Sequence, residues 1–482
     1  MMASESGPGG GKGLRRELRF WETIALSIGI MAPTAAMALN GVGVAGQVGR
    51  AVPLVFVIAG IGVGLVSYGF IRLSRHYAHA GSVYAFSGAT LGPQAGFFAG
   101  WALFGTYLAF TAASSAEVGL FGGAFLDGTG IWHNPPWVLL ALVAAALISI
   151  VAYGDIKVAT RMLLAIEAVS VTLIVILMVD IFAKVIGGSA PGHRSFGDAF
   201  SLPSGTKFSV IGLAFVLAFL SWGGFEGAAA LGEETTEPRR EIPKAIRNAV
   251  IASTVFYILC ELAQTLGFGT DASGVNTFAH SGSPLGDLGK TYIASSMGDL
   301  INLGAAVSGF ASALGTATGA SRILFAMGRD GFVSQRLGTS SQRTGAPAAA
   351  LAVVMTIAVG GLLAMWFYNL GAVAAFFYPG TMGVLSLIVA YIVTNVGAIR
   401  LFVFDRRQEA GWELLFPVLG ILLLAYVLYR NVAGQLYPFN WFPWVVGVWL
   451  AAGLGIVLAV PGLATRIGTT MSQLEQSEAA GD

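Results

Sequence analysis

Residues 219–238 read FLSWGGFEGAAALGEETTEP, and this stretch decides the fold that we predict for the chain. An apolar helix enters after Lys207, meets the pair Gly223 and Gly224, carries a carboxylate at Glu226, and resumes before an acidic exit. In a long apolar segment, a glycine pair beside a carboxylate marks a place where backbone hydrogen bonds open toward a cavity. A glutamate is costly in hydrocarbon, so it normally faces a helix bundle or a water-filled path. The stretch therefore predicts half of a ligand site midway across a membrane; the alternative is a packing glycine pair, with Glu226 bonded to a neighbouring helix.

Composition indicates that the chain lies in a lipid bilayer. Of its 482 residues, 55% are hydrophobic and 11% are charged, and the mean hydropathy is +0.75. Soluble domains carry about 25% charged residues, so this deficit indicates a polytopic membrane protein. The net charge of +1 and the lack of a basic, aromatic-rich run give no reason to expect a nucleic-acid partner. The single cysteine, Cys260, excludes a disulfide within the chain.

Twelve apolar segments predict an all-α protein with twelve transmembrane helices. These segments run over residues 22–46, 52–73, 94–126, 136–153, 157–186, 208–231, 248–269, 292–327, 347–367, 371–399, 412–429 and 441–463.

The positions of the basic residues orient these helices. If the N-terminus is cytoplasmic, most of the 26 Lys and Arg residues fall in cytoplasmic loops, as the positive-inside rule requires. We therefore expect a multi-pass protein of the plasma (inner) membrane with both termini in the cytoplasm. We expect a cytoplasmic N-terminal tail (1–18), a core of ten helices (20–400), two further helices (412–463) and a cytoplasmic C-terminal tail (467–482).

The sequence contains no pattern that indicates an enzyme. Residues 41–46 read GVGVAG and match G-x-G-x-x-G, but they lie inside an apolar helix with no preceding strand. His76 and His79 have a metal-like spacing, which a solvated face in a cytoplasmic loop explains better. No Walker loop, nucleophile elbow or zinc motif occurs. We predict no catalytic residue, no metal site and no cofactor.

A second break is predicted in the first apolar segment, where residues 27–34 read SIGIMAPT. A proline in mid-span removes an amide donor and clashes with the preceding turn, so the helix opens or kinks at Pro33. The two interrupted segments are the first and the sixth of twelve. This spacing is expected of a five-plus-five inverted repeat whose first members meet at the midplane of the membrane. The alternative is a kinked helix that serves packing alone.

Several motifs resemble those of one family, the amino acid–polyamine–organocation (APC) transporters. The most specific match lies in the sixth segment and the loop after it, and reads GFE at 224–226, GEE at 232–234 and PRREIPKAI at 238–246. Further matches are AGSVY at 80–84, GFFAGW at 96–101 and SRILFAMGRDG at 321–331. The resemblance covers about residues 20–400 and implies an amino acid permease with the inverted-repeat fold, broken helices one and six, and two extra helices.

The resemblance also implies a substrate site at the two breaks. Its candidate residues are Gly29, Met31, Ala32, Pro33 and Thr34 in the first segment, and Trp222, Gly223, Gly224, Phe225 and Glu226 in the sixth. Backbone amides there would hold the substrate carboxylate, and an aromatic ring at the break can cover an ammonium group. Many members carry a G-x-G stretch where this chain reads Ala32-Pro33-Thr34, and proline has no amide proton. An α-amino acid and a carboxylate-free amine, such as a polyamine or ethanolamine, therefore both stay open as substrates.

Four carboxylates lie well inside predicted helices, at Glu117, Glu167, Glu226 and Glu261, and no Lys or Arg lies comparably deep. Buried acids can carry protons, and they attract a substrate that bears an amine. We select Glu226 first and Glu167 second as coupling residues. Each has a structural alternative, because Glu226 belongs to the family motif, Glu167 lies near Arg161, and the other two can bond between helices.

Sodium is the alternative coupling ion. Some proton-coupled relatives carry a lysine midway along helix five, and by register from Lys157 and Arg161 that position falls near Ser170 here. The hydroxyls of Ser312 or Thr316 in helix eight could bind a hard cation together with carbonyls of helix one. Such hydroxyls more often pack helices together. We favour a coupling proton over sodium.

These observations predict a secondary active transporter that imports an amino acid or a related amine by alternating access. An importer of polyamine- or ethanolamine-type amines, or an exchanger, is the alternative. An ion channel or a non-transporting sensor is a more distant one, since no selectivity-filter sequence is visible and the short tails leave no room for an output domain. The expected partners are the small-molecule substrate, the coupling proton and the lipid bilayer.

Overall fold

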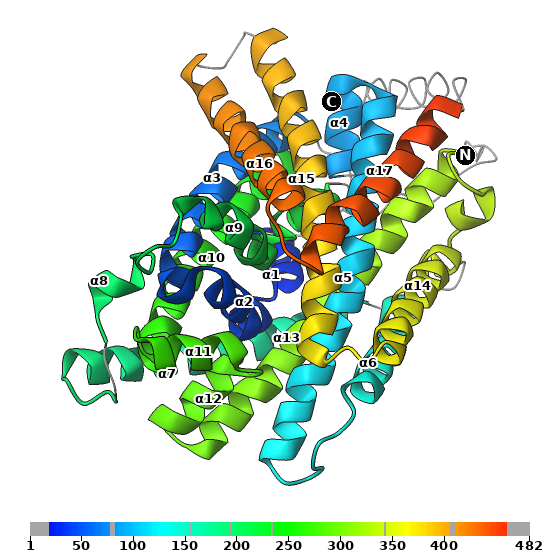
Figure 1. Cartoon of the computed structure of the whole chain (residues 1–482). Coiled ribbons are helices and arrows are strands. Elements are labelled where there is room, and N and C mark those ends of the chain that lie inside the picture. The colour runs from blue at the N-terminus through cyan, green and yellow to red at the C-terminus, as the bar shows by residue number, and fades with distance from the viewer. Residues whose placement is uncertain are drawn as a thin grey trace, which may run out of the picture.

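The computed structural model describes residues 19–77, 82–154, 156–191, 194–232, 235–341, 344–404 and 411–459. Its regular elements there are helices, which confirms the predicted all-α class (Figure 1). The two predicted tails, 1–18 and 467–482, lie outside the described residues, as do His79, Glu233 and Glu234.

The chain forms a series of α-helices joined by short 3₁₀ turns. The α-helices are α1 Phe20–Met31, α2 Pro33–Val48, α3 Val52–His76, α4 Val83–Leu91, α5 Pro93–Gly128, α6 Trp137–Tyr153, α7 Ile156–Ile186, α8 Phe196–Ala199, α9 Ile211–Phe219, α10 Pro238–Phe268, α11 Ala272–His280, α12 Pro284–Tyr292, α13 Ser295–Arg329, α14 Ala348–Phe367, α15 Ala372–Phe404, α16 Leu415–Ala433 and α17 Phe442–Ala459. The 3₁₀ turns are η1 Gly49–Ala51, η2 Phe208–Val210, η3 Leu220–Trp222, η4 Phe225–Leu231, η5 Gln335–Gly338, η6 Gly411–Leu414 and η7 Phe439–Trp441.

Ten helical segments among the described residues are long and apolar enough to cross a membrane. The longest, Thr23–His76, contains both of the first two predicted helices, and the shorter apolar helix α6 coincides with the fourth. Each predicted apolar segment is therefore helical, while twelve crossings and the inverted repeat stay predictions. The outer face of α6 exposes Leu139, Val143, Leu147 and Ile150, a stripe at helical spacing that suits lipid better than water.

The seventh helix begins earlier than predicted, at Pro238 instead of near residue 248. The PRREIPKAI motif therefore forms the first turns of α10 and is not a loop. Pro238 fits this position because the first residues of a helix have no intrahelical partner for their amides. The short helices α4, α11 and α12 were not predicted either.

Two of the family motifs meet through a hydrogen bond. Tyr84 on α4 donates its hydroxyl to Asp330, which follows α13, at 2.6 Å. Burial and the Asp330 carboxylate both raise the pKa of Tyr84, so the phenol keeps its proton and acts as the donor.

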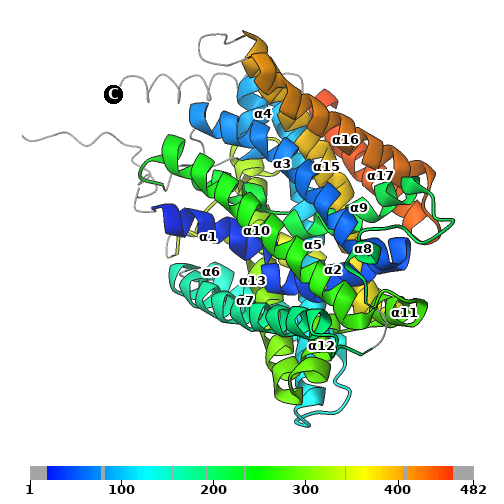
Figure 2. The same ribbon diagram turned by 90° about the vertical axis from the view of Figure 1, so that its left-hand side faces the viewer.

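The first two helices lie at the centre of the bundle. Figures 1 and 2 show α1 and α2 enclosed by the longer helices, and they pack against α9, α10 and α13. Around them, α5 runs beside both α13 and α15, and α3 runs beside α10. The predicted first break thus lies inside the protein and is shielded from lipid.

Candidate functional site

The first predicted break is present and is one residue wide. Helix α1 ends at Met31, α2 begins at Pro33, and Ala32 between them has left-handed backbone angles, φ 44° and ψ 68°. Proline disfavours helical angles in the residue before it, which explains why the helix breaks at Ala32. The Ala32 amide still donates to the Ile28 carbonyl at 2.9 Å, so the chain is kinked more than unwound.

The second predicted break is also present and is wider. Helix α9 gives way to η3, then to Gly223 and Gly224, and then to a 3₁₀ stretch, η4. Gly224 has φ 108°, a value that a residue with a side chain rarely adopts. A Cβ atom at Gly224 would lie 2.1 Å from Cγ2 of Ile30. Glycine is therefore required here both by the backbone angle and by contact with the first break.

Ser27 joins the two breaks directly. Its hydroxyl donates to the Phe225 carbonyl at 2.8 Å and accepts from the Ala228 amide at 2.9 Å. These are backbone groups of a 3₁₀ stretch that lacks regular α-helical bonding. The meeting of the first and sixth segments is the arrangement that the sequence predicted.

Each break carries a carboxylate of the protein itself. At the first break, the Thr34 amide donates to Oε1 of Glu167 on α7 at 2.8 Å. At the second, Glu226 accepts the hydroxyl of Tyr107 at 2.7 Å and that of Tyr391 at 2.5 Å. The amides expected to hold a substrate carboxylate are therefore partly occupied.

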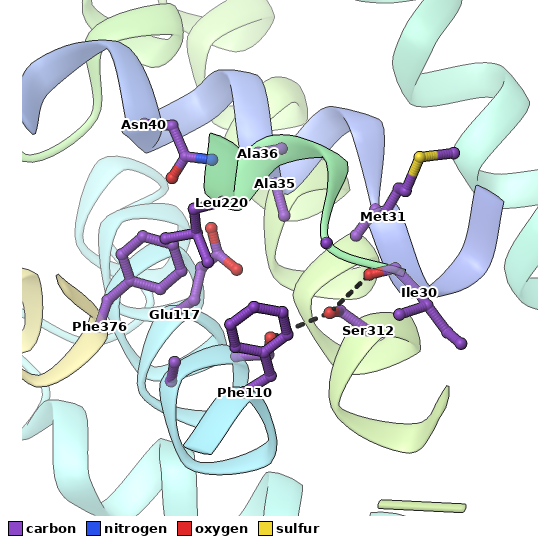
Figure 3. A pocket seen from close by; sticks show the side chains of 14 residues that line it. Ile30, Met31, Ala35, Ala36, Asn40, Phe110, Glu117, Leu220, Ser312 and Phe376 are labelled. Atoms are coloured by element: carbon purple, nitrogen blue, oxygen red, sulfur yellow. Dashed lines mark hydrogen bonds between the residues drawn. The ribbon is translucent and has the colours of Figure 1, made fainter. Parts of the chain in front are cut away.

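A small cavity lies where the two breaks face α5, α13 and α15 (Figure 3). Its volume is about 30 Å³, counted as the space open to the centre of a water molecule. One water needs roughly 10–15 Å³ on this measure, so the cavity has room for about two waters.

Four predicted site residues line the cavity: Met31, Ala32, Gly223 and Ser312. The other candidates lie around it without lining it, namely Gly29, Pro33, Thr34, Trp222, Gly224, Phe225, Glu226, Glu167, Ser170 and Thr316. Their roles in binding and coupling stay predictions.

The two aromatic candidates pack into the protein core. The Trp222 indole donates to the Thr254 hydroxyl at 3.2 Å and meets the Tyr257 ring edge-on. The Phe225 ring packs against Phe70 with centroids 5.4 Å apart. Neither ring covers the cavity in this arrangement.

The candidate coupling hydroxyls already have partners. Ser312 donates to the Ile30 carbonyl at 3.0 Å and accepts from Ser114 at 3.0 Å, which ties α13 and α5 to the first break. The Thr316 hydroxyl donates to the Ser312 carbonyl at 2.8 Å, one turn back along α13. Ser170 likewise bonds back to the Ile166 carbonyl of its own helix at 2.9 Å.

Sequence reasoning did not select the other ten residues that line the cavity: Ile30, Ala35, Ala36, Asn40, Phe110, Ala113, Ser114, Glu117, Leu220 and Phe376. Glu117 was recognised as an intramembrane acid but was not placed at the site. Its spacing could have placed it there, because Ser114 and Glu117 follow Phe110 by four and seven residues and so lie on the same face of α5. Asn40, a polar residue two turns beyond the break, offered a second signal.

Comparison with known proteins agrees with this architecture. The profile of the amino acid permease family matches residues 22–459. The branched-chain amino acid permease BcaP of Bacillus subtilis (strain 168) is 27% identical over 67% of this chain and 69% of its own. The BcaP of Lactococcus lactis subsp. cremoris (strain MG1363) is 23% identical over 89% of this chain and 93% of its own. The cationic amino acid transporter 3, mitochondrial, of Arabidopsis thaliana is 23% identical over 93% of this chain and 81% of its own.

Proposed function

The chain belongs to the amino acid permease family, and we propose that it imports an amino acid across the plasma (inner) membrane by proton-coupled alternating access. Its family and its relatives make it a multi-pass membrane transporter of amino acids. The coupling ion, the direction of transport and the mechanism are the content of the proposal.

The observation that carries the proposal is the cavity at the meeting point of the two breaks. Met31 and Ala32 of the first break and Gly223 of the second line it, and Ser312 bonds to the Ile30 carbonyl at its edge. Irregular backbone at membrane depth occurs where it lines a cavity or is buried in protein. An amino acid placed here would meet backbone groups of both broken helices.

The size of the cavity supports alternating access. Room for about two waters is less than any amino acid needs, so Phe110, Leu220 and Phe376 must move to admit one. The left-handed residues Ala32 and Gly224 are natural hinges, since they already interrupt the two helices beside the cavity. A substrate that fits only when these walls rearrange couples binding to a change of conformation.

Glu167 supports coupling to protons. Its buried carboxylate accepts the Thr34 amide at the N-terminal end of α2, where a negative charge stabilises the helix dipole. Protonation would weaken this interaction and shift the balance between conformations of the first break. A proton on Glu167 can therefore bias the same element that lines the cavity.

Uptake into proteoliposomes tests the proposal. A panel of radiolabelled amino acids, with putrescine and ethanolamine as carboxylate-free amines, is offered under an imposed proton gradient and then under a sodium gradient. We expect an amino acid to accumulate under the proton gradient alone. Accumulation only with sodium would contradict proton coupling, and accumulation of only the two amines would contradict amino acid import.

A further inference from the structure

Glu117 lies in the cavity wall as a buried acid with an unused oxygen. The side chain is 2% exposed, and its Oε1 has no hydrogen-bond partner among the described residues. Its Oε2 faces α13, where a Cβ built on Gly309 would lie 3.4 Å away. A buried carboxylate oxygen is costly unless a hydrogen-bond donor reaches it.

Asn40 presents a second unused acceptor to the same cavity. Its Nδ2 donates to the Ser221 hydroxyl at 2.7 Å, and Oδ1 of this 1% exposed side chain has no partner in the part of the chain that the structure describes. Figure 3 shows Asn40 and Glu117 on one side of the cavity, with Ile30, Met31 and Ser312 on the other. One side of the cavity therefore offers two acceptors that await a donor.

The donors near the cavity have partners within the protein. The hydroxyls of Ser114 and Ser312 form a chain that ends on the Ile30 carbonyl, and the Thr34 amide is bonded to Glu167. A ligand group that only accepts hydrogen bonds would gain nothing from the carboxylate of Glu117 or from Oδ1 of Asn40. A group that donates several, such as an ammonium or a guanidinium, would satisfy both oxygens and balance the carboxylate charge.

The shape of the cavity separates this polar side from the break. Ala35, Ala36 and Asn40 line it along one face of α2, following Ala32 at the break. The eight steps from Ala32 to Asn40 span about 12 Å along a helix. The cavity also has apolar walls: Leu220 and Phe376 lie on the side of Asn40 and Glu117, and Phe110 lies between the two sides. Such a cavity suits an apolar stem with a charged group at its far end.

We propose that Glu117 and Asn40 form the subsite for the cationic end of the substrate, so that this transporter takes amino acids with a positively charged side chain. This inference rests on the proposed function. The amino acid's own α-carboxylate and α-ammonium would lie toward Met31, Ala32 and Gly223, and the side-chain cation would lie between the two acceptor oxygens.

Competition for uptake, with matched variants, tests the subsite. Wild-type protein in proteoliposomes is given radiolabelled lysine, arginine and leucine, first singly and then against unlabelled competitors. We expect lysine and arginine to be preferred. Glu117→Gln removes the charge at nearly constant size. It should weaken the apparent affinity for lysine and arginine in uptake by about 30-fold or more, which is the loss expected when a buried charge pair loses a partner. Leucine uptake should be retained or increased.

Glu261→Gln is the matched control for this variant. Glu261 is likewise a fully buried acid whose two oxygens have no hydrogen-bond partner among the described residues, but it lies on α10 and does not line the cavity. It should leave the ratio of lysine to leucine uptake unchanged. An equal loss of lysine and leucine in Glu117→Gln would overturn the inference, because Glu117 would then hold the α-ammonium or the coupling proton.

Two further variants keep the inference testable if Glu117→Gln does not fold. Glu117→Asp retains the charge and should retain the preference for lysine over leucine. Asn40→Leu removes one acceptor and should lower that preference by about tenfold. A wild-type preference for leucine over lysine would refute the subsite while leaving amino acid import intact. Failure of wild-type protein to accumulate any amino acid would refute the proposed function itself.

Discussion

The two breaks differ in what surrounds them, and this difference indicates that one contacts the ligand while the other supports the helices around it. The first is a single left-handed residue, Ala32, whose neighbours line the cavity. The second is a glycine pair inside 3₁₀ backbone; of the pair only Gly223 lines the cavity, together with Leu220 of the preceding turn. The carboxylate of the second break, Glu226, turns away and bonds to Tyr107 and Tyr391. We infer that the first break serves the ligand, and that the second holds the helices that support it.

The largest effect is expected from Gly224→Ala, which tests whether the second break is a support. The substitution forces a side chain into φ 108° and places its Cβ 2.1 Å from Ile30. Backbone strain and overpacking together should cost roughly 2 to 5 kcal/mol of stability. Thermal unfolding in detergent, followed by tryptophan fluorescence, measures the loss.

Gly29→Ala is the control at the first break. Its new Cβ would meet nothing within 4 Å, and the residue lies inside α1. Alanine is the better helix former, so stability should be unchanged or rise by about 0.5–1 kcal/mol. Equal destabilisation by both substitutions would show that the two breaks are equally tight, against the comparison drawn here.

A smaller effect is expected from removing the tyrosine hydroxyls around Glu226. Tyr107→Phe or Tyr391→Phe deletes one of the two side-chain donors to this buried carboxylate. Each should lower stability by about 1–3 kcal/mol, since an acceptor is left short of a donor. Tyr257→Phe is the control, because the Tyr257 hydroxyl is buried with no hydrogen-bond partner among the described residues and its removal should cost little.

The same variants separate support from transport at Glu226. If this residue holds α5, the second break and α15 together, Glu226→Gln and the two phenylalanine variants should share one defect in stability and a matching loss of uptake. If Glu226 instead binds the substrate or the proton, Glu226→Gln should abolish uptake in a folded protein, while Tyr107→Phe and Tyr391→Phe transport normally.

The fold could be predicted from local signals. Apolar segments long enough to cross a membrane marked the helices, and Pro33 and the pair Gly223 and Gly224 marked both breaks. Each of these acts through its own backbone, by a missing amide or a missing Cβ, so no knowledge of the partner segment was needed. The early start of α10 was missed because its first turns are charged, and a hydropathy pattern does not register a polar helix end.

The cavity could be predicted only in part. Both breaks were placed correctly, but which intramembrane acid faces the cavity depends on the rotation of each helix about its axis. Glu226 sits beside the glycine pair in sequence and yet is held by two tyrosines, one from α5 and one from α15. Glu117 sits in the middle of a long helix and yet reaches the cavity. Tertiary packing decides this, and the sequence near each glutamate does not contain it.

The smallest effect on stability, and the sharpest on transport, is expected from Glu167→Gln at the first break. Glutamine keeps an oxygen that can accept the Thr34 amide, so only the charge at the helix end is lost, at about 0.3–1 kcal/mol. If protonation of Glu167 shifts the first break between its conformations, uptake by this variant should no longer respond to a proton gradient. Exchange of substrate across the membrane should persist. Ser170→Ala, three residues along the same helix, removes a hydroxyl that donates to the Ile166 carbonyl one turn back, and this variant should keep the response to the gradient. If Glu167→Gln still shows uptake driven by the proton gradient, Glu167 is not the coupling residue. The two breaks would then differ only in that the first contacts the substrate and the second does not.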